Sequence, residues 1–198
     1  TADVCDNIAD KFAELEAEYG GLKFTSMMNQ GEYISLIIRS IMQSLLLGAV
    51  FAVLILLLFL RHIKSTLITV FSIPVSIIFA IVLMYFSGIS LNMISLSGLA
   101  VAVGMLVDNS IVVIENTLRL RREGVPPAKA AIAGAKQVGG AITASTITTV
   151  CVFVPIIFTD GITRDLFSDM ALTIGYSLFA SLIVAMTLVP AMSANLLA

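Results

Sequence analysis

Charged residues are scarce in this chain of 198 residues: Asp, Glu, Lys and Arg together make up only 12% of it. Soluble domains carry about 25% charged residues. This chain has too few charged side chains to cover the water-exposed surface of a soluble fold of its size. The formal net charge of −2 leaves no basic patch for nucleic acid. A soluble globular domain and a nucleic-acid-binding protein are therefore both excluded.

Residues that build reactive sites are also few. Tryptophan is absent, there is a single histidine, and the two cysteines, Cys5 and Cys151, lie far apart in the sequence. Neither a disulfide framework nor a metal site is indicated. No phosphate-binding glycine loop and no nucleophile motif is present. We therefore expect no enzyme, no metal and no cofactor.

Long apolar stretches dominate what is present. The chain is 59% hydrophobic with a mean hydropathy of +1.05, and residues 40–60, 65–107, 137–159 and 170–198 carry no charge. A bilayer core needs roughly 20 helical residues, so the second stretch is long enough for two spans, with a break at the turn-forming residues 87–92. The sequence predicts an all-α polytopic membrane protein with helices near 37–60, 66–86, 92–117, 138–158 and 168–190.

The loops between these spans differ in charge. Arg61, His62 and Lys64 follow the first span, and five further Lys and Arg residues lie in 118–137, where 128–136 is predicted as a short surface helix. The loops 87–91 and 159–167 have no excess of basic residues. By the positive-inside rule, the loop 118–137 is cytoplasmic. The N-terminus is then outside and the C-terminus inside, with His62 contributing to topology.

Residues 1–35 are acidic and differ from the rest. Ile8, Phe12, Leu15 and Tyr19 recur at helical spacing, which predicts an amphipathic helix that ends at Gly20-Gly21. Residues 22–25 are expected to form a short strand. One helix and one strand cannot bury a core, so this segment is expected to be the edge of a larger extracytoplasmic domain in a longer protein.

Two acids lie inside an apolar span, Asp108 and Glu115, and their spacing of seven residues puts them on one helix face with Gly104. Asp108 lies about nine residues, or roughly 13 Å, from the nearer end of the span. A charge at such depth costs about 2.5–3.5 kcal/mol on insertion scales, so the carboxyl is expected to be neutral part of the time. We interpret Asp108 as a proton carrier; the alternative is a structural hydrogen-bonding residue.

The neighbouring polar residues are expected to play supporting roles. Glu115 lies near the membrane interface, where it can reach water or pair with Arg119. Asn109 and Asn116 lie on the adjacent face, where they either join helices or orient Asp108. Gly104 lets another helix approach closely.

The segment 104–116, Gly-Met-Leu-Val-Asp-Asn-Ser-Ile-Val-Val-Ile-Glu-Asn, resembles the fourth transmembrane helix of resistance-nodulation-division (RND) exporters, most closely the hydrophobe/amphiphile efflux branch. The resemblance continues through 122–131, 152–156 and 187–191. It implies that the chain holds helices two to six of the N-terminal half of such an exporter. Residues 1–35 then resemble the last helix and strand of the periplasmic porter domain.

This resemblance implies a proton-driven drug or amphiphile antiporter of the bacterial inner membrane. Its implied partners are the other half of the transporter, two further copies in a homotrimer, a periplasmic adaptor and an outer-membrane channel. Asp108 falls on the family's main proton-titrating aspartate, whereas Asn109 replaces a second aspartate that many members carry. A related exporter of lipids, a protein-secretion exporter and a non-transporting scaffold similar to sterol-sensing domains are the alternatives.

Overall fold

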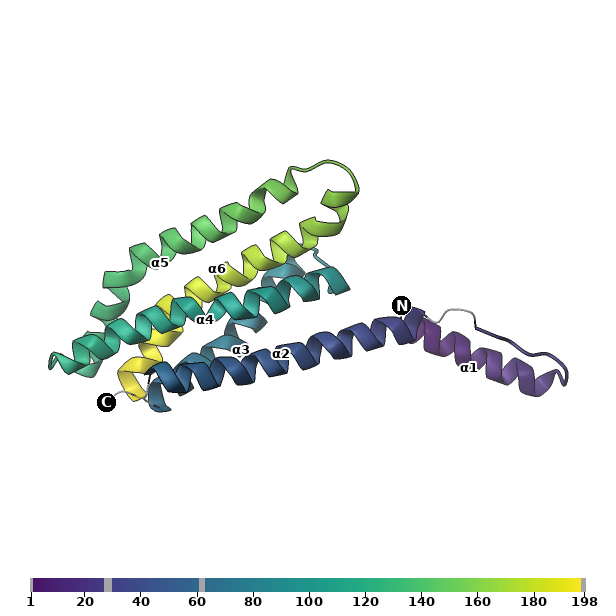
Figure 1. Ribbon diagram of the computed structural model, residues 1–198, viewed down its shortest axis with the longest axis horizontal. Coiled ribbons are helices and arrows are strands. Elements are labelled where there is room, and N and C mark those ends of the chain that lie inside the picture. The colour runs from purple at the N-terminus through teal and green to yellow at the C-terminus, as the bar shows by residue number, and fades with distance from the viewer. Residues whose placement is uncertain (1, 27–29, 61–62, 197–198) are drawn as a thin grey trace. The chain divides into compact units, whose positions relative to one another are not determined.

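A computed structural model describes residues 2–26, 30–60 and 63–196, and these ranges contain helices and no strand (Figure 1). The helices are α1 (Ala2–Glu18), α2 (Gln30–Leu60), α3 (Ile63–Phe86), α4 (Met93–Arg122), α5 (Pro127–Ile157) and α6 (Ile162–Leu196). The last five are long and apolar enough to cross a membrane, which confirms the five predicted spans. Arg61 and His62 lie outside the described residues.

The segment 118–137 is mostly helix. Residues 128–136 are helical, as predicted, but they belong to α5 and are not a short helix within a loop. α4 continues to Arg122 and α5 begins at Pro127, so only 123–126 connect them, with Gly124 at φ +89°. Arginine and lysine favour helix, and proline suits the first helical position. Hydropathy marks only the part of a helix that lies in the bilayer. It therefore underestimates the length of a helix that extends beyond the bilayer.

The chain forms two compact units, residues 1–44 and 45–198, and the boundary falls within α2. In the first unit, α1 is the predicted amphipathic helix. Its apolar residues Ile8, Phe12 and Leu15 are exposed, as is Tyr19 just after it. The chain turns after it, with Gly21 at φ +133°.

The strand predicted at 22–25 is not formed. The Phe24 amide donates to the Glu16 carboxylate at 2.6 Å, and the Phe24 ring stacks on Phe12 with a centroid distance of 4.4 Å. A strand needs a partner strand for its backbone groups, and the described part of the chain supplies none. The segment therefore folds back onto α1.

In the second unit, α4 and α6 are the central helices. α4 packs against α3, α5 and α6, and α6 also packs against α3 and α5; Figure 1 shows α4 and α6 running side by side. Leu106 and Ile114 of α4 and Ile174 and Val189 of α6 are almost completely buried. This packing fixes which face of α4 is covered.

Candidate functional site

The start of α4 is anchored by Asn92. Its Oδ1 accepts from the amides of Ile94 and Ser95, and the Ser95 hydroxyl accepts from the Asn92 amide. The Asn92 Nδ2 also donates to the Asp169 carboxylate of α6 at 2.7 Å. The break predicted at 87–92 thus ends in a capping box at the start of α4. Through Asn92, this capping box also ties α4 to α6. Hydropathy gave no sign of Asp169 in this role.

One face of α4 is left uncovered by the other described helices. We call it the open stripe; its residues, three or four positions apart, are Ser97, Val101, Gly104, Asp108, Val112, Glu115, Arg119 and Arg122, all exposed. Such spacing keeps side chains on one side of a helix. The structure therefore brings Gly104, Asp108 and Glu115 onto one face, as their spacing predicts.

Asp108 lies near the middle of this stripe and of α4. Within the described residues its carboxylate makes no hydrogen bond and no ion pair. A Cβ added at Gly104, one turn away, would meet nothing within 4 Å. Among the described residues, the carboxyl thus has no partner that would keep another part of the protein from contacting it.

Asn109 has the opposite environment and is only 8% exposed. Its Nδ2 donates to the Ser181 hydroxyl of α6 at 3.3 Å, and its Oδ1 accepts from the Thr146 hydroxyl of α5 at 3.4 Å. Ser181 in turn donates to the Leu106 carbonyl of α4 at 2.8 Å. Asn109 therefore joins three helices. Ser181 was not identified from the sequence, because a serine in an apolar span has no periodic signal.

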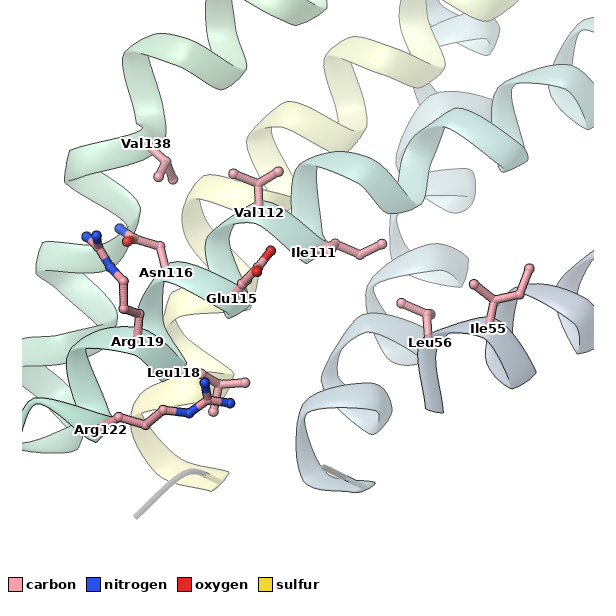
Figure 2. A pocket seen from close by; sticks show the side chains of 10 residues that line it. All are labelled: Ile55, Leu56, Ile111, Val112, Glu115, Asn116, Leu118, Arg119, Arg122 and Val138. Atoms are coloured by element: carbon pink, nitrogen blue, oxygen red, sulfur yellow. The ribbon is translucent and has the colours of Figure 1, made fainter. Parts of the chain in front are cut away.

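Near the C-terminal end of α4, Asn116 joins α4 to α5. Its Nδ2 donates to the Gly134 carbonyl at 2.9 Å and to Gln137 Oε1 at 3.0 Å. Arg119 donates to the same Gln137 oxygen at 3.2 Å. The ion pair between Glu115 and Arg119 that the sequence allows is not formed, and Figure 2 shows the ends of these two side chains directed away from each other.

Close to this end of α4 is a cavity of about 780 Å³ (Figure 2). Its lining combines apolar residues of α2, α4 and α5 with polar residues of α4. The lining residues are Ile55, Leu56, Ile111, Val112, Glu115, Asn116, Leu118, Arg119, Arg122 and Val138. Asp108 is not among them. The sequence could not predict this cavity, because its lining comes from helices far apart in the sequence.

Comparison with known proteins identifies the family of this chain and several of its relatives. The sequence model of the AcrB/AcrD/AcrF family matches residues 1–198. The swarming motility protein SwrC of Bacillus subtilis is 38% identical over 99% of this chain and 19% of its own length. The multidrug resistance protein MdtC of Photorhabdus laumondii is 40% identical over 78% of this chain and 15% of its own length. MdtC of Pectobacterium atrosepticum is 33% identical over 97% of this chain and 19% of its own length. The chain thus spans a fifth or less of the length of these relatives.

Proposed function

Since this chain belongs to the AcrB/AcrD/AcrF family of RND exporters, we propose that it is the part of a proton-driven efflux transporter that carries the proton on Asp108. The family and the five apolar helices make it a multi-pass membrane protein. The energy would come from the proton gradient, with no cofactor and no enzymatic reaction.

The observation that carries this proposal is the free carboxyl of Asp108 in the middle of α4. Among the described residues it has no partner, and ionisable residues inside membrane spans generally mark ion or proton pathways. On the open stripe, the Asp108 carboxyl would face either water or a cation from another part of the transporter at different stages of transport. Alternation between these two conditions is what proton loading and release require.

The environment of Asn109 supports assigning a single proton site to this helix. An asparagine cannot titrate, and its amide is used in contacts with α5 and α6. Glu115, near the end of α4, is assigned a structural role at the membrane interface, and Asn116 holds α4 to α5. Gly104 would let a helix of the other half of the transporter approach Asp108.

The orientation of the helices follows from the loop charges. With basic residues concentrated in 118–137, this segment would face the cytoplasm of a bacterium and residues 1–35 the periplasm. The remaining half of the transporter, supplying a cationic partner for Asp108, would cover the open stripe. Assembly as a homotrimer, with a periplasmic adaptor and an outer-membrane channel, completes the proposal.

Drugs or other amphiphiles are the proposed substrates. The relatives that are named multidrug resistance proteins support this class, and their similarity to this chain is spread over most of its length. Residues 1–35 would belong to the porter domain that contacts the substrate.

The proposal is tested by drug export from cells that express the full-length transporter. Asp108→Asn keeps the size of the side chain and removes its titration, so we expect export to stop while the membrane level of the protein is unchanged. Glu115→Gln, on the same stripe, should keep most of the export. Loss of export in Glu115→Gln together with normal export in Asp108→Asn would refute the assignment.

A further inference from the structure

Two buried hydroxyl groups lie where α3 begins and α6 ends. The Oγ atoms of Ser65 and Ser193 make no hydrogen bond within the described part of the chain, and both residues are 0% exposed. We propose that these two serines bind a buried water molecule that joins α3 to α6. The site is independent of which carboxyl carries the proton.

Ser65 and Ser193 lie at the same end of two packed helices. α3 packs against α6, and Figure 1 shows the two helices running in opposite directions, with the C-terminal end of α6 near the start of α3. Ser65 is two residues from the start of α3 and Ser193 three residues from the end of α6, so both are about 3–5 Å from these ends along the helix axes. About one turn further in, Ile68 and Val189 belong to one buried cluster. The two hydroxyls therefore flank one helix junction.

Other buried hydroxyls of the same two helices bond to backbone carbonyls. Thr69 donates to the Ser65 carbonyl at 3.2 Å, and Ser177 donates to the carbonyl four residues earlier in α6 at 2.7 Å. Ser193 also lies within α6, but its hydroxyl does not donate to the Val189 carbonyl, four residues before it. The Ser193 hydroxyl can therefore bond to a group outside α6.

Water is the occupant that suits two neutral hydroxyls. Burying a polar group without a partner is costly, and buried water typically makes about three hydrogen bonds to such groups. A serine hydroxyl can donate once and accept twice, so one water molecule can donate to one serine and accept from the other. A cation would need a negative charge to offset its desolvation, and within the described residues neither hydroxyl contacts a carboxylate at hydrogen-bond distance.

The direct test is a high-resolution electron cryo-microscopy map of the full-length transporter. We expect density for a water molecule within about 2.5–3.0 Å of both serine Oγ atoms. A map in which the two hydroxyls bond directly to each other, or in which each bonds only to a protein group, would overturn the proposal.

Thermal unfolding of purified full-length variants tests the site by the sign of the change. If water satisfies both hydroxyls, Ser193→Ala removes a hydrogen-bonded group and lowers the unfolding midpoint, and Ser65→Ala does the same. If the hydroxyls have no partner, alanine removes an unsatisfied polar group and raises the midpoint. Because the two serines share one water, the double variant should lower the midpoint by less than the sum of the two single variants.

Ser177→Ala is the matched control. Ser177 is equally buried in α6, but its hydroxyl donates within its own helix. Its effect should add fully to that of Ser65→Ala, because the two sites share no partner. Full additivity of Ser65→Ala and Ser193→Ala, or a raised midpoint in either single variant, would contradict a shared water.

Discussion

Asp108 and Asn109 are adjacent in the sequence but have opposite environments. A helix turns by about 100° per residue, so one of them lies on the open stripe and the other in the interior among α4, α5 and α6. The titratable side chain is left without a partner in the described residues, and the amide that cannot titrate makes the interhelical bonds. The two residues thus separate a proposed chemical role from an observed structural one.

Asn109→Ala removes the hydrogen bonds to Ser181 and Thr146. Interhelical hydrogen bonds in membrane proteins contribute about 0.6 kcal/mol each on average, up to about 1.7. We expect the variant to lose about 1–2 kcal/mol of stability, measured as a lower thermal unfolding midpoint of the purified full-length protein. Val112→Ala, on the open stripe, is the control and should change the midpoint less. An unchanged midpoint combined with lost export would instead mean that Asn109 acts on Asp108.

At the scale of elements, close contact between α4 and α6 depends on Gly98. A Cβ added there would lie 2.9 Å from the Met170 carbonyl oxygen and 3.2 Å from its Cα, both backbone atoms that cannot rotate away. The sequence pointed to Gly104 as a small residue for helix contact, and its proposed partner is a helix of the other half of the transporter. Glycine content indicates that some helix approaches closely, but the contact of Gly98 with Met170 is visible only in the tertiary structure.

We expect Gly98→Ala to separate α4 from α6 and to destabilise the protein by about 1–3 kcal/mol, as overpacked cores do. Gly140→Ala is the control, because a Cβ at Gly140 would meet nothing within 4 Å and alanine favours helix by up to about 1 kcal/mol over glycine. Both variants are compared by thermal unfolding. If Gly98→Ala is as stable as Gly140→Ala, then the close approach does not limit packing.

The existence of each helix could be predicted from the sequence, whereas several ends and contacts could not. Hydropathy located five spans, and the break at 87–92 followed from turn-forming residues that proved to cap α4 at Asn92. The extension of α4 through 118–122 and the continuity of 128–136 with the fourth span were missed, because arginine and lysine are compatible with helix outside the apolar region. The strand at 22–25 failed because a short apolar run has no partner strand within the described residues.

For the candidate site, the sequence predicted which residues of α4 share a face but not which residues of other helices contact them. Spacing alone put Gly104, Asp108 and Glu115 on one face, which the structure shows as the open stripe. The partners of Asn109 and Asn116 lie 18 to 72 residues away in sequence, and a single sequence does not encode such distances directly. The amphipathic cavity beside α2 was missed for the same reason.

At the scale of the whole molecule, the proposed orientation depends on the charges of the loops. In a full-length protein with Cys5 and Cys151 replaced by serine, we expect Ile63→Cys to be protected from a membrane-impermeant thiol reagent in intact cells. Ile162→Cys, at the opposite ends of the helices, should be labelled. Both positions are exposed in the structure, so the reagent can reach them from the correct side. Labelling of position 63 from outside would reverse the orientation.

The central claim is that Asp108 carries the proton that drives export. Its most direct test is proton movement in liposomes containing the full-length transporter, where an internal pH dye reports the loss of an imposed pH gradient when substrate is added. We predict substrate-dependent proton flux for the parent and for Glu115→Gln, and none for Asp108→Asn at equal protein incorporation. Substrate-dependent proton flux at the parent rate in Asp108→Asn would contradict the account.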